Sequence, residues 1–187
     1  SITYGNTQTW EQSYPSDTSG FGFGIAYDLV QASDGGYIMA GELDLPTGAI
    51  RHYIQLLKTD INGNEVWRKL LAEYGDVRMD RVNALHLMPD DGVLFGGSTA
   101  YNQQGLYLVR TDKNGDTLWT KIHYSNGIIT NFSKTNNFNF LSVVRTNTDL
   151  TLIKTDTLGN ILLTKTLDDF FQVIDIQATN NNDYIIA

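Results

Sequence analysis

Residues 58–67 read KTDINGNEVW, residues 110–119 read RTDKNGDTLW and residues 154–163 read KTDTLGNILL. These three segments align without gaps, at a spacing of 52 residues (58 to 110) and then of 44 residues (110 to 154). Each places a glycine among polar residues between two apolar runs, and Asn and Gly accept the positive φ that a tight hairpin turn requires. The first two segments end in Trp, whereas the third ends in Leu163. The chain is therefore built from units that repeat one hairpin.

A second signature runs through the same units. Residues 34–41 (DGGYIMAG) match residues 90–97 (DDGVLFGG), and weaker copies stand at residues 137–143 (NFNFLSV) and 181–187 (NNDYIIA). Each unit holds four short runs rich in Ile, Val, Tyr and Leu, which in the first unit lie at about 24–32, 37–43, 52–59 and 65–71. Four antiparallel strands in a unit of this length are typical of one blade of a β-propeller.

The sequence thus predicts an all-β fold, a propeller of four-stranded antiparallel blades that forms the incomplete N-terminal part of a larger propeller. We expect a single propeller region over residues 1–187, with these parts: an outer strand at 7–14, blade one at 22–72, blade two at 79–124, blade three at 126–167 and a partial blade at 169–187. Trp10 stands in a context like that of Trp67, so residues 7–14 resemble an isolated outer strand that could complete the last blade and cover free edges.

Composition excludes several classes of function. The net charge is −8, with 13 Lys and Arg against 21 Asp and Glu, and no basic cluster occurs, so we expect no nucleic-acid partner. No apolar run approaches the length that spans a bilayer, so we expect no membrane insertion. The chain has no Cys, which excludes disulfides, thiolate catalysis and Cys-bound metal.

The repeats resemble those of secreted bacterial β-propeller proteins, with the pattern Asp-Gly-Gly-Tyr-Ile-x-Ala-Gly followed by Lys-Thr-Asp-x-x-Gly-Asn-x-x-Trp. The likeness is strongest at residues 34–41, 53–67 and 106–119, and Leu163 departs from it. It implies an exported protein, extracellular or at the cell surface, often with a type IX secretion sorting tail. The turn and Trp are also similar to the docking motif of quinoprotein-type propellers, which implies that Trp67 and Trp119 connect adjacent blades.

The first strands of the units carry the candidate binding residues, because first strands line the central channel of a propeller. Asp28, Ala84, Asn131 and Asp175 align at one position, and His86 lies two residues beyond Ala84 on the same face. Asp28, His86 and Asp175 could bind a cation or a polar ligand. The alternative is that these side chains cap the narrow inner strands, and we favour that alternative.

The loops between the second and third strands form another candidate site. Residues 43–51 look like a long loop insertion in blade one, and Tyr101, Asn102 and Gln103 lie in the corresponding loop of blade two. Loops of uneven length on a rigid scaffold often carry binding residues. These three side chains would suit a protein or carbohydrate surface.

Other motifs are weak. Asp116-Thr117-Leu118 and Asp156-Thr157-Leu158 are similar to the short O-glycosylation motif of such secreted proteins, which makes Thr117 and Thr157 candidate glycan acceptors. The Asp-x-x-Gly turns carry too few carboxylates for Ca²⁺, and His52, His86 and His123 fall on different expected strands, so we predict no metal site and no cofactor. No spacing selects catalytic residues.

We therefore predict a non-enzymatic extracellular or cell-surface propeller, a binding or structural module of a larger assembly whose partner is a protein or a glycan. The first alternative is a glycan-active enzyme with its site at the channel mouth, which needs two acids within reach of each other. The second is a quinone- or metal-dependent propeller, which the missing Cys and scattered His disfavour.

Overall fold

The computed structural model describes residues 11–14, 24–46, 50–71, 79–99, 105–124, 127–135, 137–146, 148–168, 172–173, 175–179 and 184–187. All regular elements in these residues are strands. Blade one contains β1 (Gly24–Gln31), β2 (Tyr37–Pro46), β3 (Ile50–Thr59) and β4 (Glu65–Leu71). Blade two contains β5 (Met79–Leu87), β6 (Val93–Thr99), β7 (Gly105–Thr111) and β8 (Thr117–Tyr124). Blade three contains β9 (Ile128–Lys134), β10 (Phe140–Arg145), β11 (Leu150–Thr155) and β12 (Ile161–Thr166).

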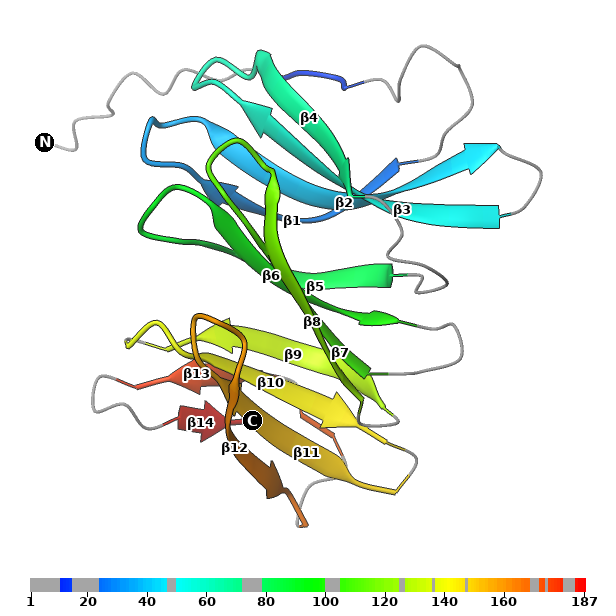
Figure 1. Ribbon diagram of the computed structural model, residues 1–187, viewed down its shortest axis with the longest axis vertical. Coiled ribbons are helices and arrows are strands. Elements are labelled where there is room, and N and C mark those ends of the chain that lie inside the picture. Colours follow the sequence, from blue (N-terminus) through cyan, green and yellow to red (C-terminus); the bar gives the residue numbers. More distant parts are fainter. Residues whose placement is uncertain are drawn as a thin grey trace, which may run out of the picture.

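Each blade is an antiparallel sheet whose strands follow one another in chain order, and the three sheets stack face to face (Figure 1). A further two-stranded sheet, β13 (Ile176–Ala178) and β14 (Tyr184–Ile186), packs beside blade three. The prediction of an all-β fold made of four-stranded antiparallel blades is confirmed.

The second and third strands of blade one are longer than the sequence pattern suggested. Residues 43–46 and 50–53 do not form a loop, because they continue the β2–β3 ladder as far as the pair Pro46 and Ile50. The reason is visible in residues 42–45 (ELDL), where polar and apolar residues keep alternating as in a strand. The expected loop insertion at 43–51 is therefore wrong, since a projecting two-stranded ribbon replaces most of it.

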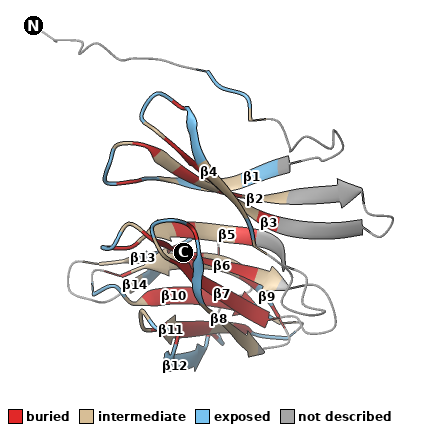
Figure 2. Ribbon diagram, turned by 45° about the horizontal axis from the view of Figure 1, so that its top comes forward, coloured by how far each residue is buried: buried red, intermediate tan, exposed pale blue. Residues whose placement is uncertain are grey.

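The core lies between the sheets rather than within one of them. The middle strands β6, β7 and β10 are almost wholly buried, whereas the outer strand β12 is exposed (Figure 2). One apolar cluster joins blade one to blade two and includes Ile38, Leu56, Leu85 and Phe95, all of them less than 2% exposed. The next clusters repeat this packing between blades two and three and between blade three and β13–β14. Stacking is thus what stabilises each sheet, because one blade has too little buried surface of its own.

The predicted hairpin turns lie between the third and fourth strands of each blade. Gly63, Gly115 and Gly159 adopt φ of +83°, +79° and +71°, the left-handed conformation that glycine tolerates. The carboxylates of Asp60, Asp112 and Asp156 accept hydrogen bonds from backbone N–H groups two and four residues later, at 2.7–2.9 Å. The Asp of each repeat therefore closes its own turn.

In the turns between the first and second strands, the left-handed residue is glycine in blade one only. Gly35 has φ of +83°, and the equivalent residues Asp91 and Phe138 have φ of +61° and +56°. Phe138 is bulky, and its left-handed backbone costs roughly 1–2 kcal/mol. Lys134 lies 4.4 Å from the centre of the Phe138 ring, a cation–π contact that offsets part of this cost.

Candidate functional site

The candidate residues of the first strands occupy equivalent positions in the structure. Asp28 pairs with Ala40, Ala84 with Gly96, Asn131 with Val143, and Asp175 exchanges both backbone hydrogen bonds with Ala187. In each of the three complete blades, the residue just before this position is left out of the pairing, which is a β-bulge. The bulge recurs because each blade must bend its inner strand at the same place.

Asp28 joins blade one to blade two. Its Oδ1 accepts a hydrogen bond from the backbone N–H of Leu29 at 2.8 Å, and its Oδ2 accepts one from Leu85 in the first strand of blade two, also at 2.8 Å. Asp175 repeats the bond that Asp28 makes to the next residue of its own strand, because its Oδ1 accepts a hydrogen bond from the N–H of Ile176 at 2.8 Å. Its Oδ2 accepts from the side chain of Gln177 at 2.9 Å.

Ala84 is the blade-two counterpart of Asp28, and His86, two residues further along β5, packs beside a stacked pair of aromatic rings in blade three. Its ring centre is 5.3 Å from that of Phe132 and 5.7 Å from that of Phe140. Burial lowers the pKa of His86, and the charge of Lys134 lowers it further, whereas Asp28 acts in the opposite direction. The Nε2 atom is buried without a hydrogen-bond partner. His86 is thus a neutral packing residue in this arrangement.

Two buried cations form a feature that the sequence reading missed. Lys58 on β3 and Arg110 on β7 have side chains only 7% and 8% exposed. The ammonium of Lys58 lies 2.7 Å from Asp34, and the guanidinium of Arg110 lies 2.5 Å from Asp90. The aligned repeats contain both partners of these ion pairs. Lys or Arg precedes Thr-Asp in all three copies of the first signature, and Asp is the first residue of the second signature at 34–41 and at 90–97.

These ion pairs perturb the carboxylates that form them. The hydrogen bond from Lys58 lowers the pKa of Asp34, and the backbone N–H of Gly36 lowers it further. For Asp90, burial raises the pKa, but the hydrogen bonds from Arg110 and Gly92 outweigh burial and leave the pKa lowered. Each ion pair connects the turn between the first two strands of a blade to the third strand of that blade. The paired carboxylate therefore has a structural role rather than that of a catalytic acid.

The outer strands β4 and β8 each contact the hairpin turn between the third and fourth strands of the next blade. A Cβ placed on Gly115 would lie 2.8 Å from the indole of Trp67, and one placed on Gly159 would lie 2.8 Å from the indole of Trp119. Lys69 forms an ion pair with Asp116 at 2.6 Å, and Lys121 donates a hydrogen bond to Asn160 in the same relationship. The expectation that Trp67 and Trp119 connect adjacent blades is confirmed.

The candidate rim residues Tyr101, Asn102 and Gln103 lie outside the described residues, between the end of β6 at Thr99 and the start of β7 at Gly105. The candidate glycan acceptors are described. Thr117 is exposed at the first residue of β8, and Thr157 is half-buried in the turn before β12. Both therefore lie at the end of the blades where the third and fourth strands are joined by hairpin turns, which we call the hairpin rim. The end of β6 and the start of β7 lie at the opposite end of the blade (Figure 1).

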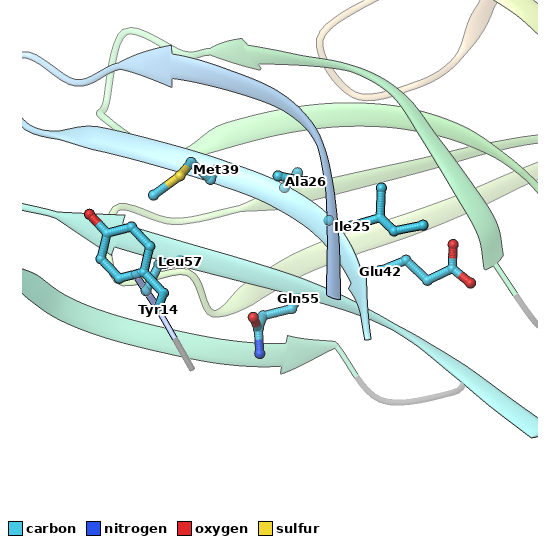
Figure 3. A pocket seen from close by; sticks show the side chains of 9 residues that line it. Tyr14, Ile25, Ala26, Met39, Glu42, Gln55 and Leu57 are labelled. Atoms are coloured by element: carbon cyan, nitrogen blue, oxygen red, sulfur yellow. The ribbon is translucent and has the colours of Figure 1, made fainter. Parts of the chain in front are cut away.

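A hollow of about 480 Å³, open to solvent, lies on the face of blade one that points away from blade two. Tyr14, Ile25, Met39 and Leu57 line its apolar part, and Glu42 and Gln55 line its polar part (Figure 3). The carboxylate of Glu42 accepts a hydrogen bond of 2.5 Å from Tyr27. One acid does not make the pair of acids that glycoside hydrolysis requires.

Metal-binding groups do not gather in the part of the chain that the structure describes, where no three His, Asp or Glu side chains come together. The same residues contain no helix that is long and apolar enough to cross a membrane.

Comparison with known proteins identifies the fold. No family model matches the chain, and the curated proteins include no significant match. A protein of unknown function from Bacteroides caccae superposes with a TM-score of 0.54 at 12% identity, covering 93% of this chain and 55% of that one. The Dos1 propeller superposes with a TM-score of 0.55 at 14% identity, covering 92% and 55%. This chain, which has the propeller fold, thus spans about half the length of the solved structures it resembles.

Proposed function

We propose that the chain is part of a non-enzymatic propeller that acts outside the cell or on its surface, as a binding or structural module of a larger assembly. The observation that supports this most is the role of Asp28. Both of its carboxylate oxygens bind backbone N–H groups, one of them in the next blade. The carboxylate of Asp28 is thus engaged in holding blades one and two together.

The binding surface that we propose is the rim that carries Tyr101, Asn102 and Gln103. The flanking strands β6 and β7 are buried and firmly paired, so this rim connection is anchored on a rigid sheet. Aromatic and amide side chains bind protein and glycan surfaces well because they combine apolar area with hydrogen-bonding groups. The partner is accordingly a protein or a glycan.

The extracellular location belongs to the same proposal and depends on the resemblance to secreted bacterial repeats, including their type IX sorting tail. Glycans on Thr117 or Thr157 would agree with export. The intact mass of the protein purified from its natural source tests this. A mass above that of the unmodified chain supports export if the excess mass disappears in the Thr117→Val or Thr157→Val variant. A mass equal to that of the unmodified chain removes this support.

A substitution at the rim tests the binding function. Wild-type protein and the variant Tyr101→Ala/Asn102→Ala/Gln103→Ala are applied to a glycan array and to intact envelopes of the producing cells. The control variant Lys113→Ala/Asn114→Ala changes two exposed residues on the hairpin rim. We expect the rim variant to lose binding at least tenfold while the control keeps it. Equal binding by both variants would refute the rim site, and cleavage of an arrayed glycan would favour an enzyme.

A further inference from the structure

The outer strand of each complete blade has a β-bulge at its second residue. Where β3 pairs with β4, Val66 is left out between the paired residues Glu65 and Trp67. Leu118 is left out in the same way in blade two, and Leu162 in blade three. These three side chains, which we call the outer bulge residues, are 58%, 57% and 53% exposed. Each follows a hairpin turn directly, so all three lie on the hairpin rim (Figure 1).

Other outer-strand positions that keep one kind of side chain have a contact that explains them. The tryptophan position and the lysine position two residues after it both contact the next blade, through Trp67, Trp119, Lys69 and Lys121. The outer bulge position is aliphatic in all three blades, yet it belongs to none of the apolar clusters that the described residues form. Packing inside the described blades therefore does not account for it.

The exposure of the outer bulge residues is not caused by a missing neighbouring blade. Leu118 belongs to blade two, which packs against blade one on one side and blade three on the other, and it is as exposed as Val66. A bulge at a sheet edge redirects a side chain, and here it turns an aliphatic group towards solvent. Single exposed apolar residues are ordinary, but the same kind at the same place in three consecutive blades forms a row. The hairpin rim thus offers a row of apolar contacts to a partner.

The hairpin rim is also acidic. The segments 60–66, 112–118 and 156–162 contain five acidic residues and one basic residue. Glu65 and Asp116 are paired with cations of β4, and the other three acids are the turn aspartates, one in each blade. The hydrogen bond from Asn64 lowers the pKa of Asp60 most strongly, so this carboxylate is charged at neutral pH. A partner that complements the row therefore carries basic residues beside its apolar ones.

The spacing of the blades favours an α-helix over an extended strand as the partner. Sheets that stack face to face lie about 10 Å apart. Seven residues of an α-helix rise about 10.5 Å and return nearly to the same face, so helix positions seven residues apart match the spacing of the row. An extended strand covers about 10 Å in three residues, and side chains three residues apart point to opposite faces. A helix can therefore contact the outer bulge residues together, whereas an extended segment cannot.

We propose that the hairpin rim is a second binding surface, which holds an amphipathic helix of a partner protein with apolar residues at heptad spacing and Lys or Arg beside them. The outer bulge residues supply the apolar contacts, and the turn aspartates supply the charge. This surface lies at the opposite end of the blades from the rim that carries Tyr101, so either surface can fail its test without the other.

A synthetic helix tests the proposal on the full natural protein. The probe is a labelled Ala-rich peptide of about 18 residues, with Leu at heptad spacing and Lys beside each Leu, and a second peptide has Glu in place of Lys. Fluorescence anisotropy measures binding to the wild type, to Leu118→Thr and to Val66→Thr/Leu118→Thr/Leu162→Thr. Leu29→Thr is the matched control, because Leu29 is also 57% exposed but lies on the first strand β1. Thr117 precedes Leu118, so protein with the mass of the unmodified chain is used.

We expect the triple variant to bind the Lys peptide at least tenfold more weakly than the wild type, and Leu29→Thr to bind it as the wild type does. The Glu peptide should bind the wild type at least tenfold more weakly than the Lys peptide. Urea unfolding checks that the variants fold, and Val66→Thr alone, which keeps nearly the same shape, replaces the triple variant if that one does not.

Three results would overturn the proposal. The first is no binding of the Lys peptide at about 1 mM. The second is equal weakening by Leu118→Thr and Leu29→Thr, since the contact would then be with any exposed leucine. The third is dimerisation of the wild type that displaces the peptide and is absent in the triple variant, because a second copy would then be the occupant.

Discussion

The indole of Trp67 in blade one lies against Gly115 in the hairpin turn of blade two, so closely that a Cβ on Gly115 would stand 2.8 Å from ring atoms Cζ3 and Cη2. The same relationship joins Trp119 to Gly159 one blade further on. Glycine is needed at these turns for two reasons: the backbone has positive φ, and the aromatic ring occupies the place of a side chain.

Gly115→Ala should therefore destabilise the protein more than a substitution at another left-handed glycine. We expect a loss of about 2–4 kcal/mol, from the strained backbone and from the clash with Trp67. Gly35→Ala is the matched control, because Gly35 has φ of +83° but its Cβ would meet only the end of the Ile61 side chain, at 3.2 Å. Its loss should be about 1–2 kcal/mol. Urea unfolding measures both, and equal losses would contradict the contact with Trp67.

Asp34→Asn should destabilise the protein because it leaves the ammonium of buried Lys58 without its counter-charge. A loss of about 1–3 kcal/mol is expected at pH 7. Since the pKa of Asp34 is lowered in the folded state, the wild-type protein should lose the same contribution as the pH falls below about 3.8. Glu65→Gln, which breaks the pair with Arg68, whose side chain is 17% exposed against 7% for Lys58, should cost less than about 0.5 kcal/mol. Chemical unfolding compares the variants, and an unchanged stability for Asp34→Asn would argue against the ion pair.

His86 should make the stability of the protein depend on pH. Its pKa in the folded state is lowered below 6.5, so the unfolded chain binds the proton more readily. The contribution of neutral His86 is present above about pH 6.5 and is lost as the pH falls towards the folded-state pKa. Urea midpoints measured at pH 7.5 and pH 5.5 should differ less in His86→Leu than in the wild type. An identical pH dependence would show that His86 is not held neutral beside the rings of Phe132 and Phe140.

Asp28→Ala should weaken the contact between blades one and two. The backbone N–H of Leu85 loses its acceptor, at an expected cost of about 1–3 kcal/mol. Asp175→Ala serves as the comparison, because its carboxylate accepts hydrogen bonds from Ile176 and Gln177 of the adjoining strand and the expected cost is below about 1 kcal/mol. Thermal unfolding of both variants provides the measurement. Similar costs for the two would mean that the bond across the blades contributes little.

The fold could be predicted because the repeats carry their own markers. Gly63, Gly115 and Gly159 mark equivalent turns, and the alternation of apolar residues between them gives the strands. The third copy of the inner turn was harder to recognise, because Phe138 adopts positive φ where glycine is the ordinary choice. Phe138 disfavours a left-handed backbone, but the pairing of β9 with β10, the strands on either side of the turn, imposes that conformation.

The candidate site could be predicted less well. Alignment of the repeats placed Asp28 and Asp175 at one position of the inner strands, and the structure agrees. Alignment does not show which way a carboxylate turns, so the bond from Asp28 to Leu85 of the next blade was not foreseen. The ion pairs of Lys58 and Arg110 were missed for a similar reason, because each joins residues 20 or more positions apart.

One NMR spectrum tests the central claim most directly, namely that the tryptophans mark equivalent corners of stacked blades. Nuclear Overhauser cross-peaks should connect the Trp67 ring protons with the α-protons of Gly115, and the Trp119 ring protons with those of Gly159. The ring currents should also shift both pairs of glycine α-protons away from the position found for Gly35, whose nearest side-chain neighbour is Ile61. Cross-peaks at one glycine only, or α-protons at ordinary positions in both, would contradict a repeated contact between blades.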